Sequence, residues 1–178
     1  MNSNKGFTLI ELVTVVAILS VLVTLATMSW LDYLPKNRVN AAMDELFTEM
    51  QRAKIKSVSE NREYSITFNT TANSYSIYYD NSGTPVLVKT VSIPTNYTKI
   101  QFGRNTSAGV IPGTSGSGAV TFTGTPPKAI FYTTGLGKAG TVYLMPEDDT
   151  ARDDRHRAIT VSPAGRIKAW KHTGSAWE

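Results

Sequence analysis

Residues 5–12 read KGFTLIEL and lead directly into an uncharged apolar segment that runs from Leu12 to Leu31. The far end of this segment has no small-residue site at which a secretory peptidase would cut. One carboxylate, that of Glu11, lies at the start of the apolar stretch, four residues after Phe7. A charged group near hydrocarbon is costly and usually functional, so we expect Glu11 to have a partner.

The stretch GFTLIEL, residues 6–12, resembles the class III leader of type IV pilins and type II secretion pseudopilins. The resemblance implies that prepilin peptidase cuts between Gly6 and Phe7 and methylates the new amino terminus at Phe7. It also implies that Glu11 pairs with the free amino terminus of a neighbouring subunit during filament assembly. A plain single-pass membrane protein, with no processing at Gly6, is the alternative interpretation of the same segment.

The apolar segment also predicts a location. A helix of about 20 residues spans roughly 30 Å, which is the thickness of one bilayer core. Lys5 precedes the segment and favours a cytoplasmic amino terminus, so the chain beyond Asp32 would face the periplasm. Together with the resemblance, this predicts a single-pass protein of the bacterial inner membrane that later enters a pilus or pseudopilus.

The composition sets further bounds. A chain of 178 residues has room for one compact domain in addition to the anchor. The net charge of +4 is mildly basic and by itself only weakly indicates an anionic partner. The absence of Cys excludes a disulfide framework and a thiolate metal site.

The helical pattern continues beyond Pro35. Apolar residues recur there at alternating steps of four and three, which predicts one stripe packed on a domain. The stripe consists of Val39, Met43, Leu46, Met50 and Ala53. We therefore predict one helix from about Phe7 to Glu60, in which Pro35 lacks a backbone donor and permits a bend.

After Asn61 the composition changes to short runs of alternating apolar and polar residues, separated by turns rich in Gly and Pro. This pattern predicts an antiparallel sheet or sandwich, and hence an α+β protein of the pilin type whose long N-terminal helix, transmembrane in its first half, packs on that β domain. The expected strands are Tyr64–Phe68, Ser74–Tyr79, Pro85–Ile93, Tyr97–Phe102, Ala119–Thr123, Lys128–Thr133, Thr141–Met145, Ala158–Ser162 and Arg166–Lys171.

The expected domain organisation has four parts. Residues 1–6 form the prepilin leader peptide, 7–35 the transmembrane and filament-core helix, 36–61 the amphipathic half of the helix, and 62–178 the antiparallel β domain.

Further resemblance narrows the subgroup. Asn37 and Arg38 at the start of the soluble half-helix, and RAITVSPAGRIK at residues 157–168, resemble the FimT/GspH-like minor pilins. Met28 stands where major pilins usually have Pro, which argues against a major pilin. The resemblance implies a structural subunit of a type II secretion pseudopilus or a type IV pilus, two systems that the sequence does not separate. The implied partners are other pilin subunits, prepilin peptidase, the inner membrane and the assembly platform.

Two motifs resemble binding sites. Gly135–Gly140 has dinucleotide-binding spacing, but the β-branched and aromatic residues that follow predict a strand where that chemistry needs a helix. Carboxylates at residues 147–154 could hold calcium, although their spacing matches no EF-hand loop and arginines lie among them. We interpret the first motif as a turn between strands and the second as a solvated loop.

The sequence gives little support for a catalytic site. The only histidines, His156 and His172, lie in a charged loop and a near-terminal tail, and Ser162 near His156 lacks a supporting acid and oxyanion donors. We therefore predict no enzyme activity, no catalytic residues, no metal and no cofactor.

A basic C-terminal segment suggests a second function. From residue 152 onward, the cations Arg152, Arg155, Arg157, Arg166, Lys168 and Lys171 oppose only Asp153, Asp154 and Glu178. Alternation along one predicted strand places Arg166, Lys168 and Trp170 on a single face, which could contact phosphates and stack on bases.

The resemblance bears on the same segment. FimT/GspH-like pilins of some naturally competent bacteria bind DNA through a basic Gly-Arg-x-Arg segment, and residues 165–168 here read GRIK. DNA binding for uptake, through Arg166, Lys168, Trp170 and Lys171, is therefore the alternative function. The other interpretation is that this exposed face contacts neighbouring subunits.

Overall fold

The computed structural model describes residues 6–148 and 151–178, without the side chains of residues 25–32. The predictions that concern Lys5, Asp149 and the side chain of Met28 lie outside the described residues. The chain divides into a first unit that ends at Lys36 and a second that runs from Asn37 to Glu178.

One long helix, α1 (Leu9–Ser59), belongs to both units and continues through Pro35. It begins with a capping box: the hydroxyl and N–H of Thr8 donate to Glu11 Oε2 at 2.8 and 2.9 Å, and the N–H of Glu11 donates back to Thr8 Oγ1 at 3.3 Å. It ends where Asn61 takes the left-handed conformation, with φ of 51°. The predicted helix from Phe7 to Glu60 is thus confirmed to within two residues.

The first unit presents apolar side chains to solvent. More than half of each side chain is exposed at Leu9, Ile10, Leu12, Val13, Val15, Val16, Ile18, Leu19, Val21, Leu22 and Val23. None of the helices formed by the described residues qualifies, by length and hydropathy, as a membrane-spanning segment.

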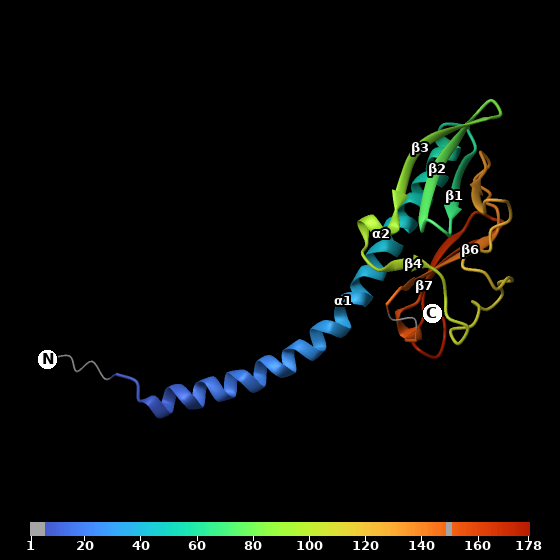
Figure 1. The fold of residues 1–178 in the computed structure, drawn as a ribbon. Helices are drawn as coiled ribbons and strands as arrows, with labels where there is room; N and C mark the ends of the chain where they lie inside the picture. The colour runs from blue at the N-terminus through green and yellow to red at the C-terminus, as the bar shows by residue number, and fades with distance from the viewer. Residues whose placement is uncertain (1–5, 149–150) are drawn as a thin grey trace. The chain divides into compact units, whose positions relative to one another are not determined.

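In the second unit, the described residues form two antiparallel four-stranded sheets (Figure 1). The first has the order β3-β2-β1-β5 and the second the order β4-β6-β7-β8. The first sheet contains β1 (Tyr64–Asn69), β2 (Ser74–Asn81), β3 (Thr84–Ser92) and β5 (Lys128–Phe131). The second contains β4 (Ile100–Phe102), β6 (Gly140–Pro146), β7 (Arg157–Val161) and β8 (Ile167–Lys171). The short helices α2 (Ile93–Asn96) and η1 (Asp153–Arg155) lie in the connections.

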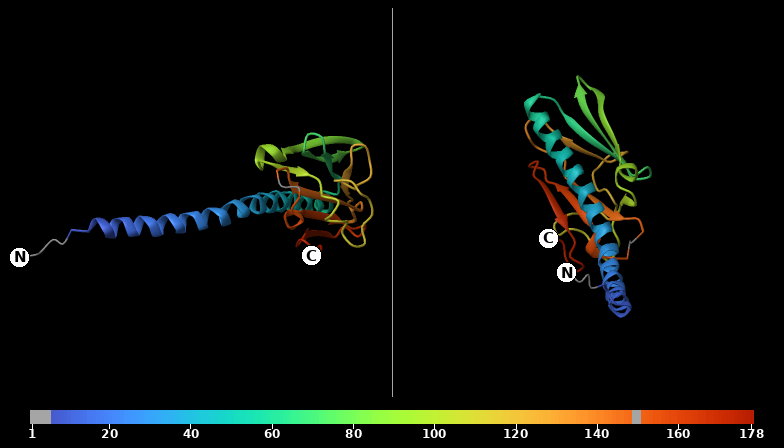
Figure 2. Two further views of the ribbon diagram at one scale, coloured as in Figure 1. Left: turned by 60° about the horizontal axis from the view of Figure 1, so that its bottom comes forward. Right: turned by 90° about the vertical axis from the view of Figure 1, so that its left-hand side faces the viewer.

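Both sheets share one hydrophobic core with the part of α1 that belongs to the second unit. The predicted stripe is buried at Val39, Leu46, Met50 and Ala53, and Met43 packs at its margin. Side chains from β1, β2, β6 and β7 complete this core. Figure 2 shows this second-unit part of α1 crossing the two sheets. The prediction of an α+β fold, with a helix on antiparallel sheets, is confirmed.

The structure corrects some of the expected strands in part. Ala119–Thr123 forms only a single bridge, between Val120 and Val142. The strand expected at Tyr97–Phe102 is shorter, because Lys99 has a φ of 64° and extended pairing begins only at Ile100. Residues 93–96, expected in part as strand, form α2, since Pro94 suits the first turn of a helix.

Candidate functional site: the N-terminal segment and the basic hairpin

The Gly6–Phe7 bond lies in an exposed segment just before α1. Residues 6–8 have no regular secondary structure, and the side chain of Phe7 is almost fully exposed. Apart from Gly6 and its two chain neighbours, no atom of the described residues lies within 4 Å of the place where a side chain on Gly6 would begin. The residues on both sides of this peptide bond are therefore exposed.

The hydrogen bonds at Glu11 show a local use of its carboxylate that our sequence analysis missed. In the free subunit, Glu11 Oε2 accepts both bonds from Thr8 and holds the first turn of α1. A Thr followed three residues later by Glu is a readable signature of this cap. The sequence could therefore have shown it, had Glu11 not been considered only as a partner for another subunit.

The turn between β7 and β8 is held by backbone contacts. The N–H of Gly165 donates to the Ser162 carbonyl at 2.8 Å, and Gly165 has a φ of 71°. A Cβ on Gly165 would lie only 2.0 Å from the carbonyl oxygen of Gly135, in the β5–β6 connection. The Gly135–Gly140 motif thus lies between strands and is followed by β6, as predicted.

β8 presents two different faces. Ile167 and Ala169 pair with the core residues Val161 and Ile159 of β7. Lys168 and Trp170 lie on the other face, where Lys168 Nζ sits 3.3 Å from the centre of the Trp170 ring. This places two of the four DNA-binding candidates together.

The same contact limits base stacking. Lys168 covers one face of the Trp170 ring, and the indole N–H of Trp170 donates to Thr160 Oγ1 at 2.9 Å. A base could stack on the covered face only if Lys168 moved away. The other two candidates, Arg166 and Lys171, are exposed: Arg166 precedes β8, and the backbone of Lys171 pairs with Glu178.

Part of the C-terminal positive charge is internal. Arg155 and Arg157 belong to the basic C-terminal segment, but both side chains are buried. Arg157 donates from Nε to Asn40 Oδ1 at 2.6 Å, and from a terminal nitrogen to the carbonyls of Asp154 and His156 at 3.1 and 2.7 Å. Burial lowers the pKa of Arg157 from its ordinary value. The basic surface is therefore smaller than the sequence suggests.

Both histidines, which the sequence places in a charged loop and a near-terminal tail, are buried. His156 Nε2 accepts from the Asn105 N–H at 3.2 Å, so its Nδ1 donates to the Asp153 carbonyl at 3.0 Å. His172 Nδ1 accepts from the Gly174 N–H, and its ring packs edge-to-face on Trp177. These contacts give both rings a structural role.

The acidic loop uses its described carboxylates for local contacts. Asp148 lies 2.9 Å from Lys99, whose hydrogen bond lowers the pKa of that carboxyl group. Asp153 accepts from the Ser107 hydroxyl at 2.8 Å. Among the residues of known placement, no three potential ligands of the His, Cys, Asp and Glu types are grouped to hold a metal ion.

Two family models match the chain. The prokaryotic N-terminal methylation motif matches residues 1–27, and the type II transport protein GspH matches residues 42–165. The chain belongs to the GspH family. The expected resemblance to GspH-like minor pilins is thereby confirmed. No protein of curated function matches the chain.

Solved structures support the same fold for this GspH-family chain. The minor pseudopilin EpsH from the type 2 secretion system of Vibrio cholerae matches with a TM-score of 0.57 at 5% identity, over 75% of this chain and 97% of that one. The type IV minor pilin FimU of Pseudomonas aeruginosa matches with a TM-score of 0.51 at 17% identity, over 76% and 90%. At these identities the likeness concerns the fold alone.

Proposed function

We propose that this GspH-family chain is a structural subunit of a type II secretion pseudopilus or a type IV pilus, processed by prepilin peptidase between Gly6 and Phe7 and N-methylated at Phe7. The observation that carries the proposal is that the methylation motif, residues 1–27, includes the N-terminal part of α1, whose described apolar side chains are exposed. A large exposed apolar surface indicates an interaction with lipid or protein.

The proposed assembly begins in the inner membrane. The uncharged run from Leu12 to Leu31 has the length and composition of an anchor, which supports storage of the subunit in the bilayer with its C-terminal domain in the periplasm. Residues 1–6 would be removed, 7–35 would enter the filament core, and 36–61 would join that core to the β domain at 62–178. The assembly platform and other pilin subunits are the proposed partners.

Glu11 would set the register between subunits. In the free chain, Glu11 Oε2 accepts both hydrogen bonds from Thr8. Among the described residues, none donates a hydrogen bond to Glu11 Oε1. The cationic amino terminus of a neighbouring Phe7 could pair with this carboxylate while the cap on α1 stays in place. A subunit placed out of register would leave Glu11 unpaired in apolar surroundings, which is strongly unfavourable.

The variant Glu11→Gln tests this role, because a glutamine at this position retains the capping box and removes the charge. We expect cleavage at Gly6, measured by mass spectrometry, to be normal, and sheared filaments to fall at least tenfold below the parent. Thr8→Ala is the matched control: it weakens the cap, keeps the charge and should still assemble. Normal filament yield from Glu11→Gln would contradict the proposed pairing.

A second candidate function is DNA binding at the filament surface. The contact of Lys168 with the Trp170 ring, on the half-buried face of β8 and close in sequence to the exposed Arg166, is the observation that favours it. A cationic face beside an aromatic ring suits a phosphate backbone.

A further inference from the structure

β8 is an edge strand of the second sheet. Hydrogen bonds from Ser162 N–H to the Arg166 carbonyl, and from His172 N–H to the His156 carbonyl, lie at the two ends of the β7–β8 ladder. Hydrogen-bonded and non-hydrogen-bonded residue pairs alternate along an antiparallel ladder. The backbones of Lys168 and Trp170 therefore exchange hydrogen bonds with β7. The N–H and C=O groups of the residues between them therefore point away from β7.

Those outward groups belong to Ile167 and Ala169. The next outward residue, Lys171, already exchanges two backbone bonds of 2.9 Å with Glu178. The turn at residues 163–165 closes the other end of the strand. Among the described residues, this leaves a short open edge with two donors and two acceptors, which is the template that an added strand uses.

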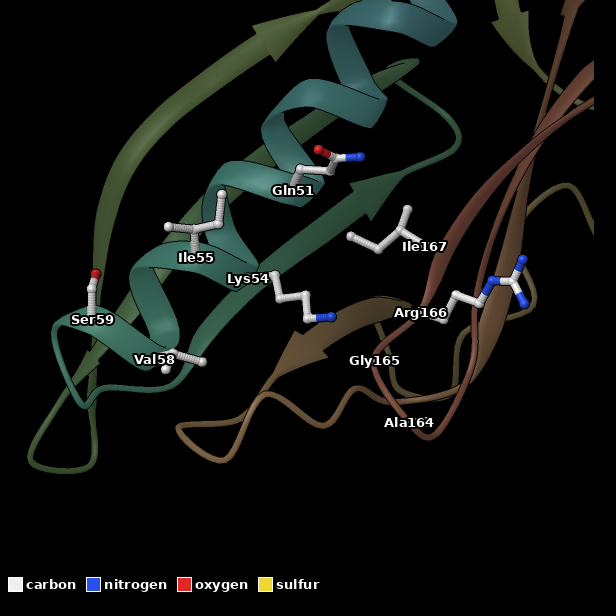
Figure 3. Close-up of a pocket in the computed structure, with 9 residues that line it drawn as sticks. All are labelled: Gln51, Lys54, Ile55, Val58, Ser59, Ala164, Gly165, Arg166 and Ile167. Carbon is white, nitrogen blue, oxygen red and sulfur yellow. The ribbon is translucent and has the colours of Figure 1, made fainter.

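An apolar groove lies beside the start of this edge, between α1 and the β7–β8 turn. It has a volume of about 710 Å³ (Figure 3). Ile55 and Val58 of α1 line it and are 66% and 51% exposed. Ile167 points from β8 towards α1 on the opposite side. An occupant with apolar side chains would cover this surface.

The charge around the groove has one sign. Lys54 and Arg166 line it, and its lining contains no carboxylate. Figure 3 shows Lys54 reaching from α1 towards the turn. Lys171, which is exposed, adds a further cation at the far end of the open edge. An occupant that brings carboxylates would therefore be favoured over a basic one.

We propose that the open edge of β8 accepts a short, extended, acidic segment of another filament subunit as an added strand. Its backbone pairs with Ile167 and Ala169, its apolar side chains cover Ile55 and Val58, and its carboxylates approach Lys54 and Arg166. The identity of the partner as a filament subunit rests on the proposed function. The docking chemistry rests on the edge, the groove and the charge.

A peptide probe tests the docking on the full chain in detergent. The probe is a fluorescein-labelled peptide of seven alternating valine and glutamate residues, and its binding is followed by fluorescence anisotropy. We expect saturable binding that is lost when the peptide is N-methylated on alternate residues, because N-methylation removes donors and keeps the side chains. An alternating valine and lysine peptide should not bind. Absence of binding by the glutamate peptide, or equal binding by the lysine peptide, would overturn the proposal.

Two protein variants locate the site. Ala169→Pro removes a donor on the open side only, a change that edge strands accept, and should weaken binding roughly five- to tenfold. Ile55→Asp places a carboxylate in the groove and should weaken peptide binding at least as much. Leu87→Asp, at a 54% exposed position on β3, is the matched control and should bind as the parent does. Parental affinity in either of the first two variants would overturn the proposal.

The outcome of the peptide-binding experiment does not depend on the proposed role of the chain in filament assembly. Glu11→Gln should lose assembly and keep peptide binding, because Glu11 is in the first unit and the edge is in the second. Ile55→Asp and Ala169→Pro leave Arg166 and Lys168 in place, so they also separate strand docking from DNA binding.

Discussion

Arg157 is the clearest case of a single residue on which the β domain depends. Its side chain is 1% exposed, and its guanidinium joins α1, through Asn40, to the carbonyls of Asp154 and His156. Hydrogen bonds to a charged group each contribute about 1.5–3 kcal/mol, and a buried acceptor left unpaired adds a cost.

We expect Arg157→Lys to lower the free energy of unfolding by about 2–4 kcal/mol, because one ammonium group cannot bridge three acceptors as the planar guanidinium does. Urea unfolding of the detergent-solubilised chain, followed by tryptophan fluorescence, measures the change. Lys171→Met, at an exposed position, is the control and should lie within about 0.5 kcal/mol of the parent. If Arg157→Lys also changes the free energy of unfolding by no more than about 0.5 kcal/mol, the buried contacts of Arg157 do not stabilise the fold.

At the scale of elements, the local sequence patterns predicted individual helices and strands better than they predicted which strands pair. The stripe Val39–Ala53 indicated the helix correctly, because periodicity depends only on which face is buried. The run Ala119–Thr123 has strand composition but forms one bridge, since pairing depends on a neighbouring strand with a free side. The open edge of β8 was also beyond prediction, because sequence does not give the order of strands in a sheet.

The β7–β8 hairpin is the element on which DNA binding depends. We expect the full chain in detergent to bind a short DNA duplex at about 50 mM salt and to bind it more weakly at about 200 mM. The double variant Arg166→Ala with Lys168→Ala should weaken binding and lower the slope of log K against log salt by about 2.

The matched control for the hairpin variant is Arg52→Ala with Lys128→Ala, which removes the same charge from two exposed positions. Its affinity should stay close to the parent value. If the hairpin variant binds DNA as the parent does, or if both double variants lose affinity equally, the hairpin is not the binding site.

At the scale of the molecule, the contacts that join distant segments were outside the reach of the sequence. Asn40 and Arg157 are separated by 117 residues, and nothing in either local pattern indicates their hydrogen bond. His156 likewise accepts a hydrogen bond from the backbone N–H of Asn105, which is 51 residues away in the chain. By contrast, the N-terminal methylation motif was readable, because it is a contiguous segment of the chain.

His156 makes the stability of the β domain depend on pH. Burial lowers its pKa below the ordinary value of 6.5, although the carbonyl and carboxylate of Asp153 oppose the shift. As the pH falls through 6.5, the unfolded chain therefore takes up a proton before the folded chain does. The free energy of unfolding should decrease between about pH 7.5 and 5.5, with a slope of at most about 1.4 kcal/mol per pH unit.

Urea unfolding at several pH values measures this slope, and His156→Gln should make it shallower. A slope that is unchanged in His156→Gln would assign the pH dependence to other groups.

The close approach of Gly165 to Gly135 has a consequence for how the chain can vary. Pro163, Ala164 and Arg166 are exposed, so a scan of every substitution in this turn would find most changes harmless there. At Gly165 any side chain would collide with a backbone oxygen, and nothing nearby could rotate to make room. Gly165 should therefore tolerate no substitution, whereas the residues beside it in the β7–β8 turn should tolerate most.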